Sequence, residues 1–176
     1  MLKQINTCPQ WFIDATFQIT PKGFQQVLNI VVYVPHLKIY FPGCYIFMTN
    51  KTESLYNKCF EMLKAIAKDL GFELKPKFLM CDFELALRNA AKSSFPDLEI
   101  GGCYSHFVKC LYDKITKLGL RRKVFRPKSR LLVSFLQILV HCEQSKREEL
   151  YEEIKKIYSD EDKAFEDFLA ISMIIG

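Results

Sequence analysis

Residues 11–19 read WFIDATFQI, and the pattern of this segment is the first indication of the fold class. Apolar side chains recur at every second position from Trp11 to Ile19, which is the period of a β-strand. Asp14 stands in the middle of this predicted strand, although strand interiors normally exclude Asp and burying an unpaired carboxylate costs free energy. We therefore expect either a bound cation beside Asp14, or an Asp14 that lies on the solvent face or pairs with Lys or Arg.

Two more strands follow at short intervals, at residues 26–34 and 44–48, after turns at residues 21–23 and 35–38. The first of them is almost wholly apolar and rich in β-branched residues, as a central strand is. Three strands joined by short connections predict an antiparallel meander.

Beyond Thr52, a plausible N-cap, the apolar residues change to helical spacing, and Gly71 marks a helix end. The predicted elements are, in order, a helix at 55–70, a strand at 77–81, a helix at 83–95, a strand at 98–103 and a helix at 107–118. A meander followed by right-handed β-α-β crossovers predicts an α/β fold, namely an RNase H-like mixed five-stranded sheet covered by helices.

The rest of the chain predicts helices only, at 131–141, 145–158 and 160–174. We therefore expect two parts: an RNase H-like core over residues 1–120 and an all-helical segment over residues 121–176.

The composition is that of a folded protein without a membrane span. The chain has 176 residues, of which 49% are hydrophobic and 26% charged, and no apolar run approaches the roughly 18–20 residues that cross a bilayer. The first residues do not resemble a signal peptide. Seven cysteines at irregular spacing indicate reduced thiols, most of them in the core. These features predict a nuclear or otherwise intracellular protein.

Charge is unevenly distributed along the chain. Nine Lys or Arg and a single acid, Asp113, lie between Lys109 and Arg130, whereas ten acids and five bases lie between Glu143 and Asp167. The basic stretch is a candidate contact for nucleic-acid phosphates, and ordinary charged helix surfaces are the alternative. The candidate DNA-binding residues are Lys109, Lys117, Arg121, Arg122, Lys123, Arg126, Lys128 and Arg130.

Asp82 is the second candidate of the site, since it follows a predicted strand and precedes a predicted helix. Taken alone, it could be a helix N-cap. In the predicted topology, however, the first and fourth strands are neighbours, so Asp14 and Asp82 can meet. Two facing carboxylates suit Mg²⁺ or Mn²⁺, and two such ions could promote an in-line displacement at phosphorus.

Four motifs in the same order resemble those of Mutator-like (MULE) transposases, over roughly residues 11–118. They are Asp14-Ala15-Thr16-Phe17 with Pro21-Lys22-Gly23-Phe24, Met48-Thr49-Asn50-Lys51-Thr52-Glu53, Cys81-Asp82-Phe83-Glu84-Leu85-Ala86-Leu87, and Gly102-Cys103-Tyr104-Ser105-His106-Phe107. Each motif is weak alone, whereas four in register are fairly specific.

The resemblance implies a DDE-type catalytic core with Asp14 and Asp82 as its first two acids and metal ligands. Enzymes of this family cut DNA strands and join them to target DNA with two metal ions, so transposon ends, target DNA and a homodimeric partner are the implied partners. The family's third acid, a Glu after a helical insertion, has no match here, and we expect a truncated and inactive core. The alternatives are a domesticated or remnant DNA- or protein-binding derivative without catalysis, and an unrelated α/β domain.

Cys103 and His106 form the Cys-x-x-His element of the last motif. They could offer half a metal site, or His106 could stand beside the carboxylates and position a phosphate or a proton. The alternative is a buried Cys and a His at the start of a helix. We therefore treat both residues as accessory candidates.

Overall fold

The computed structural model of this chain describes residues 2–124, 126–158 and 168, so the predicted helix at 160–174 lies almost wholly outside the described residues. The fold divides into two compact units, the first ending at Cys103 and the second beginning at Tyr104. Each unit has its own buried residues and is described by itself.

The first unit contains a five-stranded sheet in the order β3-β2-β1-β4-β5. Its strands are β1 (Gln10–Thr16), β2 (Gln26–Val34), β3 (Ile39–Met48), β4 (Phe78–Cys81) and β5 (Glu99–Gly102). The first three strands pair antiparallel, whereas β4 is parallel to both β1 and β5. This is the mixed RNase H-like sheet that the sequence predicted.

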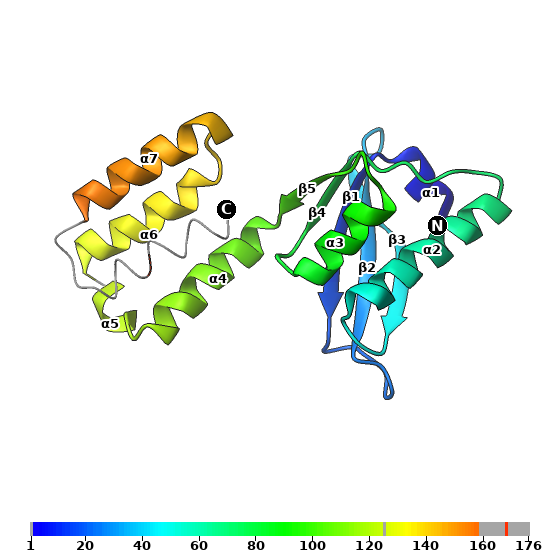
Figure 1. Cartoon of the computed structure of the whole chain (residues 1–176), viewed down its shortest axis with the longest axis horizontal. Coiled ribbons are helices and arrows are strands. Elements are labelled where there is room, and N and C mark those ends of the chain that lie inside the picture. Colours follow the sequence, from blue (N-terminus) through cyan, green and yellow to red (C-terminus); the bar gives the residue numbers. More distant parts are fainter. Residues whose placement is uncertain (1, 125, 159–167, 169–176) are drawn as a thin grey trace. The chain divides into compact units, whose positions relative to one another are not determined.

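Helices cover one face of this sheet, because apolar side chains of both layers bury one another there. Figure 1 shows α2 (Glu53–Asp69) and α3 (Leu85–Ser94) over that face. Alternate residues of the central strands point into this core, among them Trp11, Leu28 and Ile30, which are at most 1% exposed. The residues between them, including Asp14, lie on the opposite face.

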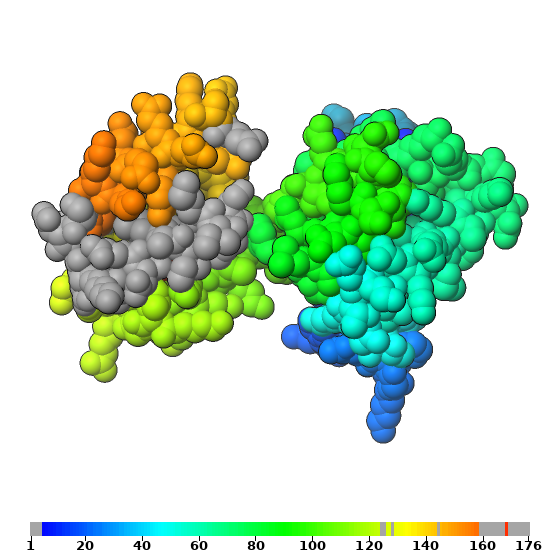
Figure 2. Space-filling view, viewed as in Figure 1, coloured from blue at the N-terminus to red at the C-terminus, as the bar shows by residue number. Residues whose placement is uncertain are grey.

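Strand ends differ from the prediction where polar groups redirect the chain. The predicted first strand continues to residue 19, but β1 ends at Thr16, whose carbonyl accepts a hydrogen bond from Thr20 Oγ1 at 3.0 Å. Phe17 and Ile19, which the alternating pattern placed on the buried face, are 50% and 71% exposed. Figure 2 shows the β1–β2 connection projecting from the first unit.

Two local features were absent from the prediction. A short helix, α1 (Leu2–Thr7), packs against β2 and β3, with Ile5 against Gly43. Strand β3 begins at Ile39 rather than at residue 44, because the register shift beside Ile30 and Val31 carries the strand through Pro42 and Gly43. A bulge of this kind accommodates a residue that the ladder cannot pair.

The second unit contains helices only among its described residues, and it begins before residue 121, where the helical segment was expected. Its described helices are α4 (Tyr104–Lys117), α5 (Arg121–Val124), α6 (Pro127–Leu139) and α7 (Gln144–Ile157). Its buried side chains include Leu111, Leu132 and Tyr151, one each on α4, α6 and α7. No described helix is both long enough and apolar enough to cross a membrane.

Candidate functional site

Asp14 lies near the end of β1, on the sheet face opposite α2 and α3, and its side chain is exposed. The expectation that a cation must offset its burial is therefore wrong in its premise. Alternation along β1 turns Ile13 into the core and Asp14 away from it. The exposed side chain of Asp14 is accessible to ligands from solvent.

Strand register brings Asp14 and Asp82 to the same level of the sheet. The parallel ladder pairs Phe12 with Met80, and each aspartate lies two residues beyond its member of this pair. Asp14 lies in β1 and Asp82 directly follows β4, which ends at Cys81, so both residues stand near the carboxyl ends of two neighbouring parallel strands. Neighbouring strands are about 4.8 Å apart, and a site shared by the two carboxylates stays a prediction.

Asp82 stands in the turn between β4 and α3, where its Oδ1 accepts a hydrogen bond from the backbone N–H of Glu84 at 3.1 Å. The helix starts only at Leu85, with Glu84 as the N-cap residue, so the alternative reading of Asp82 as the N-cap is wrong. One carboxylate oxygen therefore holds the turn, and the other is not used by that contact.

Phe83 fixes this turn against the neighbouring strand. A Cβ atom built on Gly102 would lie 2.6 Å from two atoms of the Phe83 ring, so the ring occupies the space that a side chain at position 102 would fill. The Arg88 guanidinium lies 5.8 Å from the centre of the same ring. These contacts from β5 and α3 determine where the main chain places Asp82.

A buried polar group supports the same turn from the core side. Gln26 and Tyr56 are fully buried, and Gln26 Nε2 donates to the Tyr56 hydroxyl at 2.7 Å. Burial raises the pKa of Tyr56 well above its ordinary value; the Gln26 hydrogen bond opposes this, whereas the nearby Glu84 and the charge of Asp82 add to it. Tyr56 thus stays protonated, and its hydroxyl joins α2 to Gln26 of β2 on the core side of this turn.

Asn29 is the neighbour of Asp14 on the other side, across the antiparallel β1–β2 ladder. Its side chain is partly buried, and its Oδ1 is shielded from solvent without a hydrogen-bond partner among the described residues. Buried acceptors of this kind are uncommon and each calls for a physical explanation.

The donor set fits a hard divalent cation. Asp14 and Asp82 supply carboxylate oxygens and Asn29 an amide oxygen, which are the ligand types that Mg²⁺ and Mn²⁺ prefer. Within the described part of the chain, no group of three or more His, Cys, Asp or Glu side chains could hold a metal ion. A site here therefore needs a ligand of another type, or water, beside the two carboxylates.

The accessory pair Cys103 and His106 falls on the two sides of the boundary between the units. Cys103 continues from β5, and its backbone N–H donates to the Cys81 carbonyl at 2.7 Å. His106 lies in the first turn of α4. Both residues are partly buried, and their accessory role stays a prediction.

The predicted DNA-binding residues lie on α4, α5 and α6 of the second unit, except Arg126, which directly precedes α6. Most of them are exposed, namely Lys109, Lys117, Arg121, Arg122, Arg126 and Arg130. Lys123 is partly buried, and the side chain of Lys128 is outside the described part of the structure. On α4, the acid Asp113 lies between Lys109 and Lys117 on one helix stripe, whereas Arg121 and Arg122 have no acidic residue beside them in sequence.

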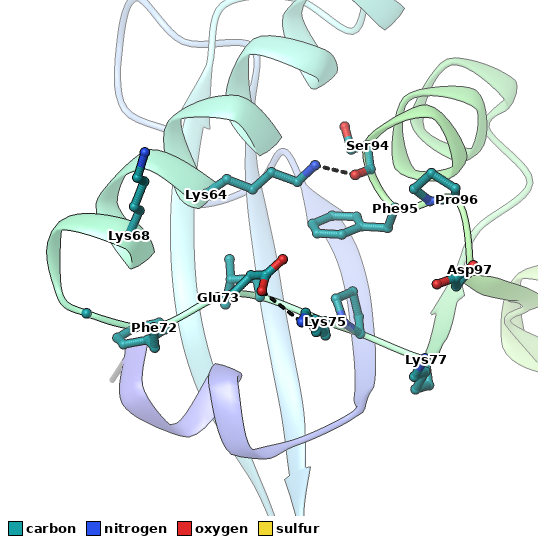
Figure 3. Close-up of a pocket in the computed structure, with 13 residues that line it drawn as sticks. Lys64, Lys68, Phe72, Glu73, Lys75, Lys77, Ser94, Phe95, Pro96 and Asp97 are labelled. Atoms are coloured by element: carbon teal, nitrogen blue, oxygen red, sulfur yellow. Dashed lines mark hydrogen bonds and ion pairs between the residues drawn. The ribbon is translucent and has the colours of Figure 1, made fainter.

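A separate cleft of about 800 Å³ lies before the amino ends of β4 and β5, away from the carboxylates that follow β4 (Figure 3). The ammonium group of Lys64 donates to the Ser94 carbonyl and lies 4.6 Å from the centre of the Phe95 ring. Lys75 pairs with Glu73 at 2.8 Å. Two lysines that line the cleft are thus engaged in local contacts: Lys64 holds the end of α3, and Lys75 holds the 72–77 loop.

A family model for the MULE transposase domain matches residues 10–110. A comparison with curated proteins found no match. Among solved structures 24 chains match, one of them from the cryoEM structure of the simian T-cell lymphotropic virus intasome in complex with PP2A regulatory subunit B56 gamma. That match is 14% identical with a TM-score of 0.35, and covers 86% of this chain and 49% of that chain.

Proposed function

Since this chain belongs to the MULE transposase domain family, we propose that it is a catalytic core for metal-dependent DNA strand cleavage and transfer, with Asp14 and Asp82 as its metal-binding acids. The family implies DNA binding, and DDE transposases generally use divalent metals. The finer assignment to these two residues is the proposal.

The observation that carries the proposal is the register of β1 and β4. Both aspartates belong to the family's matched region, and both stand two residues beyond the Phe12–Met80 pair of neighbouring parallel strands. Two carboxylates near the carboxyl ends of such strands would suit a divalent cation and a DNA phosphate.

The residues have different parts in this site. Asp14 is held in register by the antiparallel ladder to β2, which fixes the position of its main chain. Asp82 is held by the Glu84 N–H and by Phe83 against Gly102, so it can keep one oxygen toward the cation. A bound divalent cation would stabilise negative charge on the phosphate and activate the attacking water or 3′-hydroxyl.

The test is Mn²⁺ binding and DNA cleavage by the same protein. We expect calorimetric titration to show Mn²⁺ binding that Asp14→Asn and Asp82→Asn each weaken by about tenfold or more, the scale of one lost charged contact. Asp69→Asn, an exposed acid at the end of α2, is the matched control and should leave binding unchanged. Unchanged binding in both site variants would refute the assignment.

A second candidate function is DNA binding without catalysis. It is favoured by the finding that Asp14 and Asp82 gather no third His, Cys, Asp or Glu around them in the described part of the chain. Labelled duplex DNA incubated with the protein and Mn²⁺ separates the two candidates. Cleavage that depends on Asp14 supports the enzyme, whereas retarded but uncut DNA supports the binding protein.

A further inference from the structure

Asn29 forms a row with the two aspartates across three neighbouring strands. The β1–β2 ladder places Asn29 directly opposite Asp14, and the β1–β4 ladder places Asp82 level with Asp14 on its other side. Directly opposed residues of an antiparallel pair have Cβ atoms about 4.5–5.5 Å apart on the same face. The amide of Asn29 and the carboxylate of Asp14 therefore share one small region.

The Oδ1 atom of Asn29 is a buried acceptor that no described group satisfies. Leaving such an atom unpaired costs about 1–3 kcal/mol, and a cation beside it removes that cost. The residues that neighbour Asn29 along β2, namely Leu28, Ile30 and Val31, are all apolar, so the strand itself does not require an amide at this position. Valine has a higher β-strand propensity than asparagine, and we therefore look for a role of the amide outside strand formation.

Charge balance also favours an amide in this place. Two carboxylates already neutralise one divalent cation, and a neutral oxygen adds a ligand without adding repulsion beside Asp14. Amide oxygens bind hard cations such as Mg²⁺ and Mn²⁺ as carboxylates do.

We propose that Asn29 Oδ1 is a ligand of the cation that Asp14 and Asp82 hold; this inference rests on the proposed function. The competing role is positional, in which the Asn29 amide N–H donates to the Asp14 carboxylate. If Asn29 is a direct ligand, replacing its donor atom changes which metal the site prefers. If Asn29 only positions Asp14, the same replacement leaves the metal preference unchanged.

The first measurement compares Mn²⁺ affinity by calorimetry in the full chain and in Asn29→Val. Loss of one ligand oxygen should weaken Mn²⁺ binding about 10–100-fold, the range for losing a contact to a charged partner. Urea unfolding without metal is the folding control. There the variant should be at least as stable as the parent, because a buried unpaired acceptor has been replaced by a β-branched apolar residue.

The second measurement changes the donor atom. Asn29→Cys should shift metal preference from Mn²⁺ toward Cd²⁺, since thiolate prefers soft metals, and should add a thiolate-to-Cd²⁺ absorption band. Val31→Cys is the matched control: it lies on the same face of β2, opposite Phe12 instead of Asp14. It also accounts for Cd²⁺ bound by the seven native thiols.

Three outcomes are distinguishable. Weaker Mn²⁺ binding in Asn29→Val together with a Cd²⁺ gain in Asn29→Cys over Val31→Cys supports the ligand role. Mn²⁺ binding that needs Asp14 and Asp82 but is unchanged in Asn29→Val, with equal Cd²⁺ spectra for the two cysteine variants, overturns the inference and leaves the proposed function standing. A parent chain that binds no Mn²⁺ overturns both.

Discussion

Tyr56 connects the helical side of the core to the turn that carries Asp82. Its hydroxyl accepts from Gln26 Nε2, and both Gln26 and Tyr56 are fully buried. Tyr56→Phe would leave the Gln26 amide without this acceptor. We expect a loss of about 1–3 kcal/mol in the free energy of unfolding, measured by urea denaturation.

Tyr40→Phe is the control for this change, because the Tyr40 side chain is 63% exposed and should lose almost nothing. If the turn depends on Tyr56 as inferred, Tyr56→Phe also weakens Mn²⁺ binding at protein concentrations where the variant is fully folded. Equal stability of the two variants would contradict the role given to the buried hydroxyl.

Cys81 is a buried thiol directly before Asp82 in the chain. Burial raises its pKa to about 11, with Arg88 acting in the opposite direction and Asp82 in the same direction. Folding raises the pKa of this thiol. At a pH between its unfolded and folded pKa values, the thiol is therefore protonated in the folded chain and ionised in the unfolded chain. Its contribution to stability is therefore complete below pH 9, the ordinary pKa of a thiol, and is lost as the pH rises toward 11.

The free energy of unfolding should accordingly fall between pH 9 and pH 11, and Cys81→Ala should remove up to about 1.4 kcal/mol per pH unit of that fall. Urea titrations of both proteins at several pH values measure it. Cys142→Ala is the comparison, since Cys142 is only partly buried. Parallel curves for parent and Cys81→Ala would show that another group dominates.

The sequence revealed the residues of this site unevenly. Asp14 and Asp82 could be found because a carboxylate is unusual in or beside an apolar strand. Asn29 could not, since one Asn within nine residues of an apolar strand gives no indication of what lies opposite it. Gln26 and Tyr56 are 30 positions apart, and only the folded sheet brings them together.

At the scale of the element, α2 starts as its sequence predicts. The Thr52 side chain accepts from the Leu55 N–H at 3.3 Å and so satisfies one of the free donors of the first turn. Thr52→Ala should cost about 0.5–2 kcal/mol in the free energy of unfolding. Thr116→Ala is the matched control, because Thr116 bonds back to the Tyr112 carbonyl within α4 and caps no helix. Equal losses in both variants would remove the special role of the cap.

Helices were predicted more accurately than strand ends, for a physical reason. A helix is determined by spacing within one segment, so α2, α4 and α7 appeared close to their observed bounds. A strand ends where its partner ends or where a side chain captures the backbone, as Thr20 does at Thr16. The residues 17–19 continue the alternating pattern, yet nothing pairs with them in the ladder to β2.

At the scale of the whole molecule, the order of the sheet followed from connection lengths. Short turns make β1, β2 and β3 neighbours, and right-handed crossovers through α2 and α3 place β4 and β5 on the other side of β1. That order makes β1, which carries Asp14, a neighbour of β4, which Asp82 directly follows. The second unit offers no such rule, because short helices can pack in several ways, so its helices were predicted and their packing was not.

The exposed basic residues of the second unit give the last prediction, which concerns DNA affinity. Each phosphate contact that is lost lowers the slope of log affinity against log salt by about 0.9 for duplex DNA. If Arg121 and Arg122 contact phosphates, Arg121→Glu/Arg122→Glu should weaken duplex binding at low salt and reduce this slope by about 2, as measured by fluorescence anisotropy.

Lys146→Glu/Lys155→Glu is the matched control for that experiment. It makes the same change in net charge within the same unit, at residues that lie near Glu143 and Glu152 on α7 at 3.7 and 3.6 Å. A general effect of protein charge would weaken DNA binding equally in both variants, because long-range attraction depends on the summed charge. Only a local contact separates them, so equal slopes would assign Arg121 and Arg122 to ordinary helix surface.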